Sequence, residues 1–141
     1  MITRHVTVGT STDVFLEALC ERNFDRLEAA LAPEAVARLL LPRGPDQVVG
    51  PREIRARIEK WFGAATAFRI LRCEQEEIGP RQHARWRFQL VRDGASWEQI
   101  EQTAFIDCGP AGIERIDLLC SGFLPGGEAA AGQACALPAE L

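Results

Sequence analysis

A change in hydrophobic period near residue 67 constrains the fold of this chain more than any other feature. Before it, apolar residues recur every three or four positions; after it they alternate, with turn signals at Gly79-Pro80, Asp93-Gly94 and Gly109-Pro110-Ala111-Gly112. These turns divide the second half into four predicted strands, at residues 67–78, 82–92, 96–108 and 113–123. Helices followed by an antiparallel meander indicate an α+β fold, with the helices packed on one face of the sheet.

Three helices and one strand are predicted in the first half. The first helix covers about residues 13–22, with Thr12 and Asp13 as its cap and first turn. A shorter second helix begins at Asp25 and ends before Pro33, and a strand over residues 35–41 follows it.

Residues 42–46 contain two prolines and a glycine, which predicts a loop. The third helix begins at Pro51, because proline suits a first helical turn that needs no N–H group. Ile54, Ile58 and Trp61 then recur on one face, so this is the most clearly amphipathic helix of the chain.

Composition indicates one domain. The chain has 141 residues, of which 47% are hydrophobic and 26% charged, enough to form a packed core in water. The segment after Leu124 is rich in alanine and glycine and has no periodic apolar face. We therefore expect a domain over residues 1–124 and a C-terminal tail over residues 125–141.

Charge and motifs exclude several classes of function. The formal charge is −4 and the basic residues are scattered, which argues against a nucleic-acid partner. No apolar run approaches the roughly 20 residues that span a bilayer, and the N-terminal residues lack the apolar stretch of a signal peptide. We expect a soluble, cytoplasmic protein with no membrane partner.

Neither a metal nor a cofactor is expected. The five cysteines are odd in number and share no C-x-x-C spacing, and the two histidines, His5 and His83, belong to no metal-ligating group. We expect the cysteines to be reduced. Glycine-rich phosphate motifs and the G-x-S-x-G elbow of hydrolases are also absent from the sequence.

The Asp93-Gly94 signal predicts a two-residue hairpin turn and so a register for the two strands it joins. In this register Trp86 lies opposite Glu101, on an apolar face that we expect the helices to cover. A second hairpin that pairs Cys108 with Ile113 places Cys120 beside the same Glu101.

Glu101 is therefore the candidate catalytic residue. A lone carboxylate is expensive to bury, so it must be paired, hydrated in a cavity or protonated, and proteins tune acids and bases in this way. The alternative is that Glu101 lies at the sheet rim or pairs with an arginine. With a three-residue turn after strand 67–78, Arg72 lies beside Phe88 on the inner face, which allows a contact with Glu101. With a two-residue turn, Cys73 takes the place beside Phe88 and Arg72 points to solvent.

The opposite, outer face of the predicted sheet carries an apolar strip. Its members are Ile100, Ala104, Ile106 and Leu119. A contiguous apolar strip on a soluble protein marks an interaction surface, so we expect a homodimer through it.

The element order resembles that of the NTF2-like superfamily, including its SnoaL-like and ketosteroid-isomerase-like members. Residues 15–27 (FLEALCERNFDRL) are similar to its opening helices, and residues 49–54 (VGPREI) with Trp61-Phe62 to its third helix. The resemblance covers about residues 10–124. It implies a curved sheet wrapped around helices to form a cone that binds small apolar ligands, in proteins that are often dimers through the outside of the sheet.

The catalytic groups of the steroid isomerases carry over only in part. The position of Glu101 is similar to that of an aspartic acid of their oxyanion hole. The tyrosine of the family falls at Phe15, and the general base falls near Leu41-Pro42, with Asp46 as the nearest carboxylate. Steroid isomerisation is therefore disfavoured.

Together these features predict a SnoaL-like protein that binds a small, largely apolar molecule between helices and sheet. If it is an enzyme, Glu101 would support cofactor-free acid/base chemistry of the isomerase, cyclase, hydratase or dehydratase type. The alternative is a noncatalytic ligand-binding or protein-interaction module. The expected pocket residues are Phe15, Leu19, Trp61, Trp86, Phe88, Thr103, Leu118 and Cys120, with Arg72 as the partner of Glu101.

Overall fold

The computed structural model describes residues 2–3, 10–94 and 96–126. In chain order its elements are β1 (Ile2–Thr3), α1 (Ser11–Glu21), α2 (Phe24–Ala29), β2 (Leu31–Leu41), β3 (Gly44–Val49), α3 (Pro51–Phe62), β4 (Ala65–Ile78), β5 (Arg81–Arg92), β6 (Trp97–Gly109), β7 (Gly112–Cys120) and β8 (Leu124–Pro125). Most of the predicted tail, residues 127–141, lies outside the described residues.

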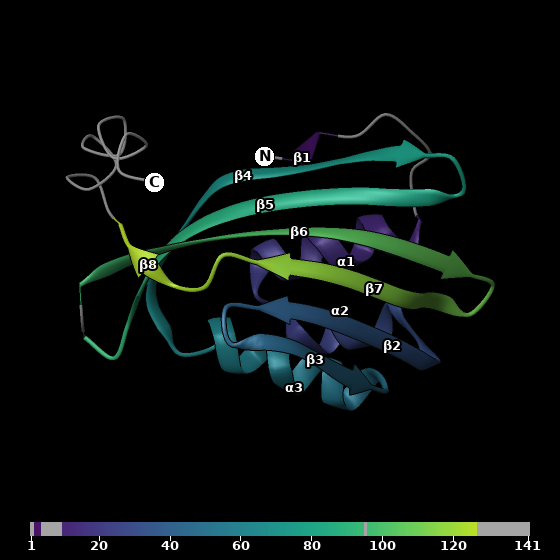
Figure 1. The fold of residues 1–141 in the computed structure, drawn as a ribbon, viewed down its shortest axis with the longest axis horizontal. Helices are drawn as coiled ribbons and strands as arrows, with labels where there is room; N and C mark the ends of the chain where they lie inside the picture. The colour runs from purple at the N-terminus through teal and green to yellow at the C-terminus, as the bar shows by residue number, and fades with distance from the viewer. Residues whose placement is uncertain (1, 4–9, 95, 127–141) are drawn as a thin grey trace.

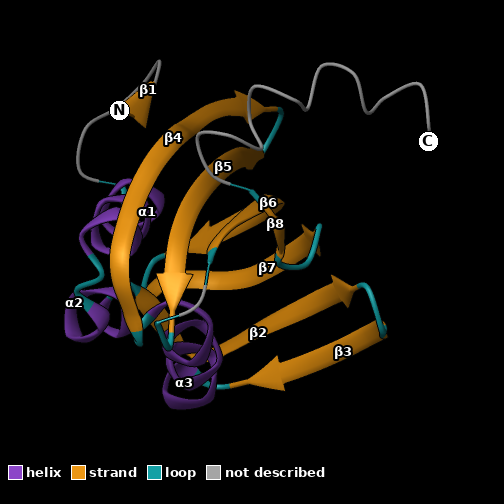
Figure 2. Ribbon diagram, turned by 90° about the vertical axis from the view of Figure 1, so that its left-hand side faces the viewer, coloured by secondary structure: helices purple, strands orange, loops and turns teal. Residues whose placement is uncertain are grey.

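The strands form one mixed sheet in the order β1-β4-β5-β6-β7-β2-β3 (Figure 1), and β8 pairs with β6. The β4–β7 meander is antiparallel as predicted, whereas β2 joins it through a parallel pairing with β7. Figure 2 shows that the sheet is strongly curved and that the three helices lie together on one side of it. The predicted α+β architecture is confirmed.

The first helix begins earlier than predicted. Thr10, rather than Thr12, is its N-cap: the N–H of Asp13 donates to Thr10 Oγ1 at 3.1 Å, and the N–H of Thr10 donates to Asp13 Oδ2 at 3.3 Å. This reciprocal pair of bonds satisfies two backbone donors that a helix start leaves free.

The predicted loop over residues 42–46 is wrong. Leu41 pairs with Gly44, so only two residues turn the chain between β2 and β3, and Pro45 lies within β3. Because β3 is the last strand of the sheet, the N–H group that proline lacks is not needed by a further neighbour.

The predicted register of β5 and β6 is wrong by one residue. Val91 pairs with Trp97, so Trp86 lies opposite Gln102 and Arg87 lies opposite Glu101. Asp93 and Gly94 do adopt the positive φ angles of a tight turn, 55° and 71°, but the ladder resumes one residue later than a two-residue turn requires. Because side chains alternate along a strand, this offset turns β6 over.

A bulge has the same effect on the next hairpin. Cys108 pairs with Ile113 as predicted, but an irregularity beside it shifts the rest of the ladder, so Cys120 lies opposite Gln102. Ile100, Ala104 and Ile106, predicted on the outer face, are at most 1% exposed and belong to the core.

The core lies between the inner sheet face and the helices. At its centre the Trp86 Nε1–H donates to Gln102 Oε1 at 2.7 Å, and Gln102 Nε2 donates to Cys120 Sγ at 3.3 Å. Buried polar groups are tolerated when they are paired in this way. Phe62 and Phe88 pack beside them with ring centroids 5.3 Å apart.

Gly112 lets the start of β7 lie against the connection between α2 and β2. The N–H of Ile113 donates to the Ala30 carbonyl at 3.0 Å, and a Cβ on Gly112 would lie 2.8 Å from that same oxygen. Glycine also accommodates the φ of 127° at this position. The glycine therefore allows the parallel pairing that connects β2 to the meander.

We expect Gly112→Ala to lower the free energy of unfolding by about 3 kcal/mol or more, since it adds backbone overlap to the strain of a positive φ. Gly44→Ala is the matched control, because Gly44 has a φ of 125° and a Cβ added there would meet no atom within 4 Å. It should cost about 1–2 kcal/mol. Urea unfolding measures both, and equal losses would contradict the close approach at Gly112.

Candidate functional site

Glu101 lies on the outer sheet face, not in the core. Its carboxylate accepts a hydrogen bond from Arg87 Nε at 2.6 Å, and Arg87 Nη2 lies 2.5 Å from the same oxygen, Oε1, as an ion pair. Its backbone N–H donates to Ser121 Oγ at 2.9 Å. The predicted placement beside Trp86 and Cys120 is therefore wrong, and the buried-acid argument for its catalytic role does not hold.

The turn before β5 contains two residues, Gly79 and Pro80, because Ile78 pairs with Arg81. Of the two alternatives that the sequence left open, this is the one in which Cys73 is buried and Arg72 points outward. Arg72 still approaches Glu101, with Nη1 3.9 Å from Oε2, but the pair lies on the outer face.

Most of the predicted pocket residues fill the core. Phe15, Leu19, Trp86 and Phe88 are at most 1% exposed. The space left between α1, α3 and the inner sheet face is about 10 Å³, and Phe15, Trp61 and Leu118 are among the residues that line it. That is about the size of a single water site, so this part of the core has no room for an organic ligand.

A larger cavity lies between the β2–β3 turn, the last turns of α3 and the end of β7. We call it the mouth cavity; its volume is about 290 Å³. It contains two of the predicted pocket residues, Trp61 and Cys120. The complete lining is Leu41, Pro42, Arg43, Arg57, Lys60, Trp61, Cys120, Gly122 and Phe123.

The charged side chains of the mouth cavity are all basic. Arg57 is held by Asp46, with Nη2 2.8 Å from Oδ2, and this hydrogen bond keeps the pKa of Asp46 below its ordinary value. Arg43 and Lys60 are exposed and form no ion pair within 4 Å among the described residues. The lining itself contains no carboxylate and no imidazole.

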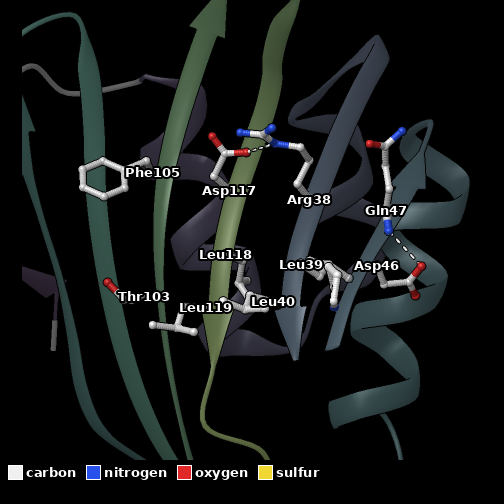
Figure 3. A pocket seen from close by; sticks show the side chains of 11 residues that line it. Arg38, Leu39, Leu40, Asp46, Gln47, Thr103, Phe105, Asp117, Leu118 and Leu119 are labelled. Carbon is white, nitrogen blue, oxygen red and sulfur yellow. Dashed lines mark hydrogen bonds and ion pairs between the residues drawn. The ribbon is translucent and has the colours of Figure 1, made fainter. Parts of the chain in front are cut away.

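A second hollow, which we call the outer hollow, lies on the sheet face away from the helices, over β2, β3, β6 and β7 (Figure 3). Its volume is about 680 Å³. Leu40, Phe105 and Leu119 are among its lining residues, and they are 51%, 37% and 51% exposed. Thr103, predicted in the inner pocket, lines this hollow instead and is hydrogen-bonded to His83, with Oγ1 2.8 Å from Nε2.

Asp117 at the edge of the outer hollow is shared by three arginines. Its carboxylate lies 2.7 Å from Arg38 Nε, 2.8 Å from Arg81 Nη2 and 3.3 Å from Arg115 Nε. The hydrogen bond from Arg38, followed by those from Arg81 and Arg115, holds the pKa of Asp117 far below its ordinary value. This network connects β2, β5 and β7 across the outer face.

Over the part of the chain that the structure describes, no group of three or more histidine, cysteine, aspartate or glutamate side chains is placed to hold a metal ion. Within the same residues, no helix is both long and apolar enough to cross a membrane.

The fold is that of NTF2-like proteins. An NTF2-like protein of unknown function from Burkholderia xenovorans has a TM-score of 0.56 and 12% identity, covering 89% of this chain and 88% of that one. An LEH-like epoxide hydrolase from M. tuberculosis has a TM-score of 0.59 and 19% identity, over 79% of this chain and 80% of that one. A proposed SnoaL-like polyketide cyclase from Shewanella denitrificans has a TM-score of 0.59 and 13% identity, over 79% and 88%.

No protein-family model matches the sequence, and no curated protein matches it. At identities this low, the structural similarity establishes the NTF2-like fold and leaves the reaction and ligand to be argued from the site.

The sequence did not indicate Arg43, Lys60 or Phe123 as site residues, and it indicated Leu41 only as the position near which the general base of the steroid isomerases falls. They come from three segments that are far apart in the chain, and only the folded hairpin, helix and strand end bring them together. The one available signal was Trp61, an aromatic residue beside a lysine in the last turn of an amphipathic helix.

We expect Asp117→Asn to lower the free energy of unfolding at pH 7 by about 1–2 kcal/mol, since it weakens three charge-assisted hydrogen bonds. The pKa of Asp117 is lowered on folding, so its contribution is complete above the unfolded pKa of about 4 and is lost as pH falls below it. The difference between wild type and variant should therefore shrink below pH 4.

Urea unfolding between pH 2 and 7 measures this difference. Glu76→Gln is the control. Glu76 is exposed, and within the described residues its carboxylate has no ion-pair contact other than His83 Nδ1 at 3.9 Å, so the change should alter stability by less than about 0.5 kcal/mol. A pH-independent difference for Asp117→Asn would show that the network acts through shape rather than charge.

Proposed function

We propose that this protein binds a small, largely apolar organic molecule in the mouth cavity. The observation that carries the proposal is a 290 Å³ cavity with aromatic walls in a domain whose inner core is otherwise filled. This volume lies just below the range for ligand pockets, about 300–1,000 Å³, so it suits a small molecule of one or two rings.

The walls of the mouth cavity favour a flat ligand. Trp61 and Phe123 both pack against the core, so their rings have restricted freedom, and the guanidinium of Arg92 lies 3.6 Å from the centre of the Phe123 ring. Leu41 and Cys120 supply further apolar surface. Burial of a planar apolar ligand against such walls would provide most of the binding free energy.

Binding without catalysis is the form of this function that the side chains support. General acid/base chemistry most often uses a histidine or a carboxylate within hydrogen-bond reach of the ligand, and the residues that line the mouth cavity include neither; Lys60 and Cys120 are the lining residues that could exchange a proton. Glu101, on the outer face, is engaged by Arg87. The noncatalytic alternative for an NTF2-like domain therefore fits better than an isomerase or cyclase.

A thermal-shift screen of bicyclic aromatic compounds tests the proposal. Compounds that bind wild type should raise its Tm by a few degrees at concentrations well above Kd. Leu41→Trp, which adds bulk to the mouth cavity wall, should abolish these shifts. Ile78→Trp places the same side chain at a half-exposed position away from the cavity and should leave them unchanged. Shifts that survive Leu41→Trp would reject the mouth cavity as the site.

We further propose that a second copy of the chain covers the outer hollow. Leu40, Phe105 and Leu119 expose large apolar surfaces around it, and such patches on monomeric proteins are usually interaction sites. Of the predicted dimer strip only Leu119 lies on this face, because the offset of β6 buries the other three members.

Light scattering after size exclusion should therefore give a dimer at micromolar concentration for wild type. Leu119→Arg should give a monomer, because an arginine in the centre of an apolar contact is expensive to desolvate. Leu124→Arg is the control at a position of similar exposure, 50%, outside the outer hollow, and should remain dimeric. A wild-type monomer at micromolar concentration would refute the dimer.

A further inference from the structure

We propose that the ligand of the mouth cavity is an organic anion, a planar apolar molecule with one carboxylate that lies between Arg43 and Lys60. This inference rests on the proposed function and adds the chemical class of the ligand. It follows from the distribution of charge around the cavity.

Among the described residues, neither Arg43 nor Lys60 of the mouth cavity has a carboxylate within ion-pair distance, unlike the arginines of the outer sheet face such as Arg81 and Arg87. Arg81 is paired with two aspartates at 2.7 and 2.8 Å, and Arg87 is paired with Glu101 at 2.5 Å. Around the cavity, Asp46 bonds to Arg57 and attracts Arg43 only at longer range, and no acidic residue is part of the lining. One carboxylate thus faces three cations, so the rim carries a net positive charge.

The two unpaired cations approach the cavity from different elements. Arg43 lies in the β2–β3 turn, and Lys60 lies in the last turns of α3, directly before the wall residue Trp61. A ligand with its ring against Trp61 would therefore place an attached carboxylate at the rim, near both cations. Because both cations are exposed, their attraction for the carboxylate is modest and is screened by salt.

Lys60 has a second role that the experiment must separate. It lies near the C-terminal end of α3, where the helix dipole favours a cation. Loss of a dipole interaction would change the stability of the protein but would affect charged and neutral ligands equally. Loss of a ligand contact would change only the affinity for the anion.

Isothermal titration with 2-naphthoate and its neutral isostere 2-naphthamide provides this separation. Wild type should bind naphthoate about tenfold more tightly than naphthamide. Lys60→Met and Arg43→Met should each weaken naphthoate binding about fivefold, the effect of losing a partly exposed ion pair, and leave naphthamide binding unchanged. Added salt should weaken only the binding of naphthoate.

Asp46→Asn is a matched variant that should strengthen, rather than weaken, the binding of naphthoate. It removes the carboxylate that compensates Arg57, so the rim gains positive charge, and naphthoate should bind more tightly while naphthamide does not change. The Tm of each variant without ligand identifies any general loss of stability. A variant series in which naphthoate and naphthamide affinities change together would overturn the inference.

The outcomes distinguish failure of this inference from failure of the proposed function. If both probes bind equally and Leu41→Trp abolishes both, the mouth cavity is a binding site without charge selection, and the inference alone fails. If neither probe binds, or if Leu41→Trp has no effect, the proposed function fails and the inference fails with it. Naphthoate binding that is lost in Leu119→Arg instead would assign the anion to the outer hollow and overturn both.

Discussion

The rest of the structure depends on which side chains of β6 face the core and which face the outer side of the sheet. This strand lies between β5 and β7, so its inward residues must pair in the core with both neighbours at once. Gln102 faces inward, where its amide accepts from Trp86 and donates to Cys120, and Glu101 faces outward to Arg87. A neutral amide satisfies these partners without the cost of burying a carboxylate, so the opposite arrangement would be strongly disfavoured.

The sequence predicts the elements well and the faces of β6 wrongly, for one physical reason. Period and turn residues indicate where elements lie, so the meander and the presence of all three helices are predicted, although the second helix ends at Ala29 and Pro33 lies within β2. The face of each residue depends on whether a connection has an odd or even number of residues, and both β6 hairpins contain one extra residue. A comparison of the two possible registers by the hydrophobic residues that each buries could have corrected the predicted faces of β6. The observed register places Ile100 and Ile106 in the core and pairs Arg87 with Glu101.

The site is predicted less completely than the fold, because it is formed by segments that share no local pattern. Trp61 and Cys120 can be identified from their apolar character and position in their elements. Arg43 cannot be identified from the sequence. It lies between Pro42 and Pro45, which predict an irregular loop, whereas the structure has a hairpin that ends in the edge strand β3. Surface cations carry no periodic signal, and their significance appears only when the fold shows which cavity they surround.

The location of free space in the domain also determines what kind of chemistry it can support. Phe62, Phe88 and Trp86 fill the inner core, where an acid or base would be desolvated and its pKa shifted. The mouth cavity lies at the end of the sheet, where Arg43 and Lys60 are exposed. Such a site can attract and orient an anion, and the selectivity that we propose for it would come from charge and shape.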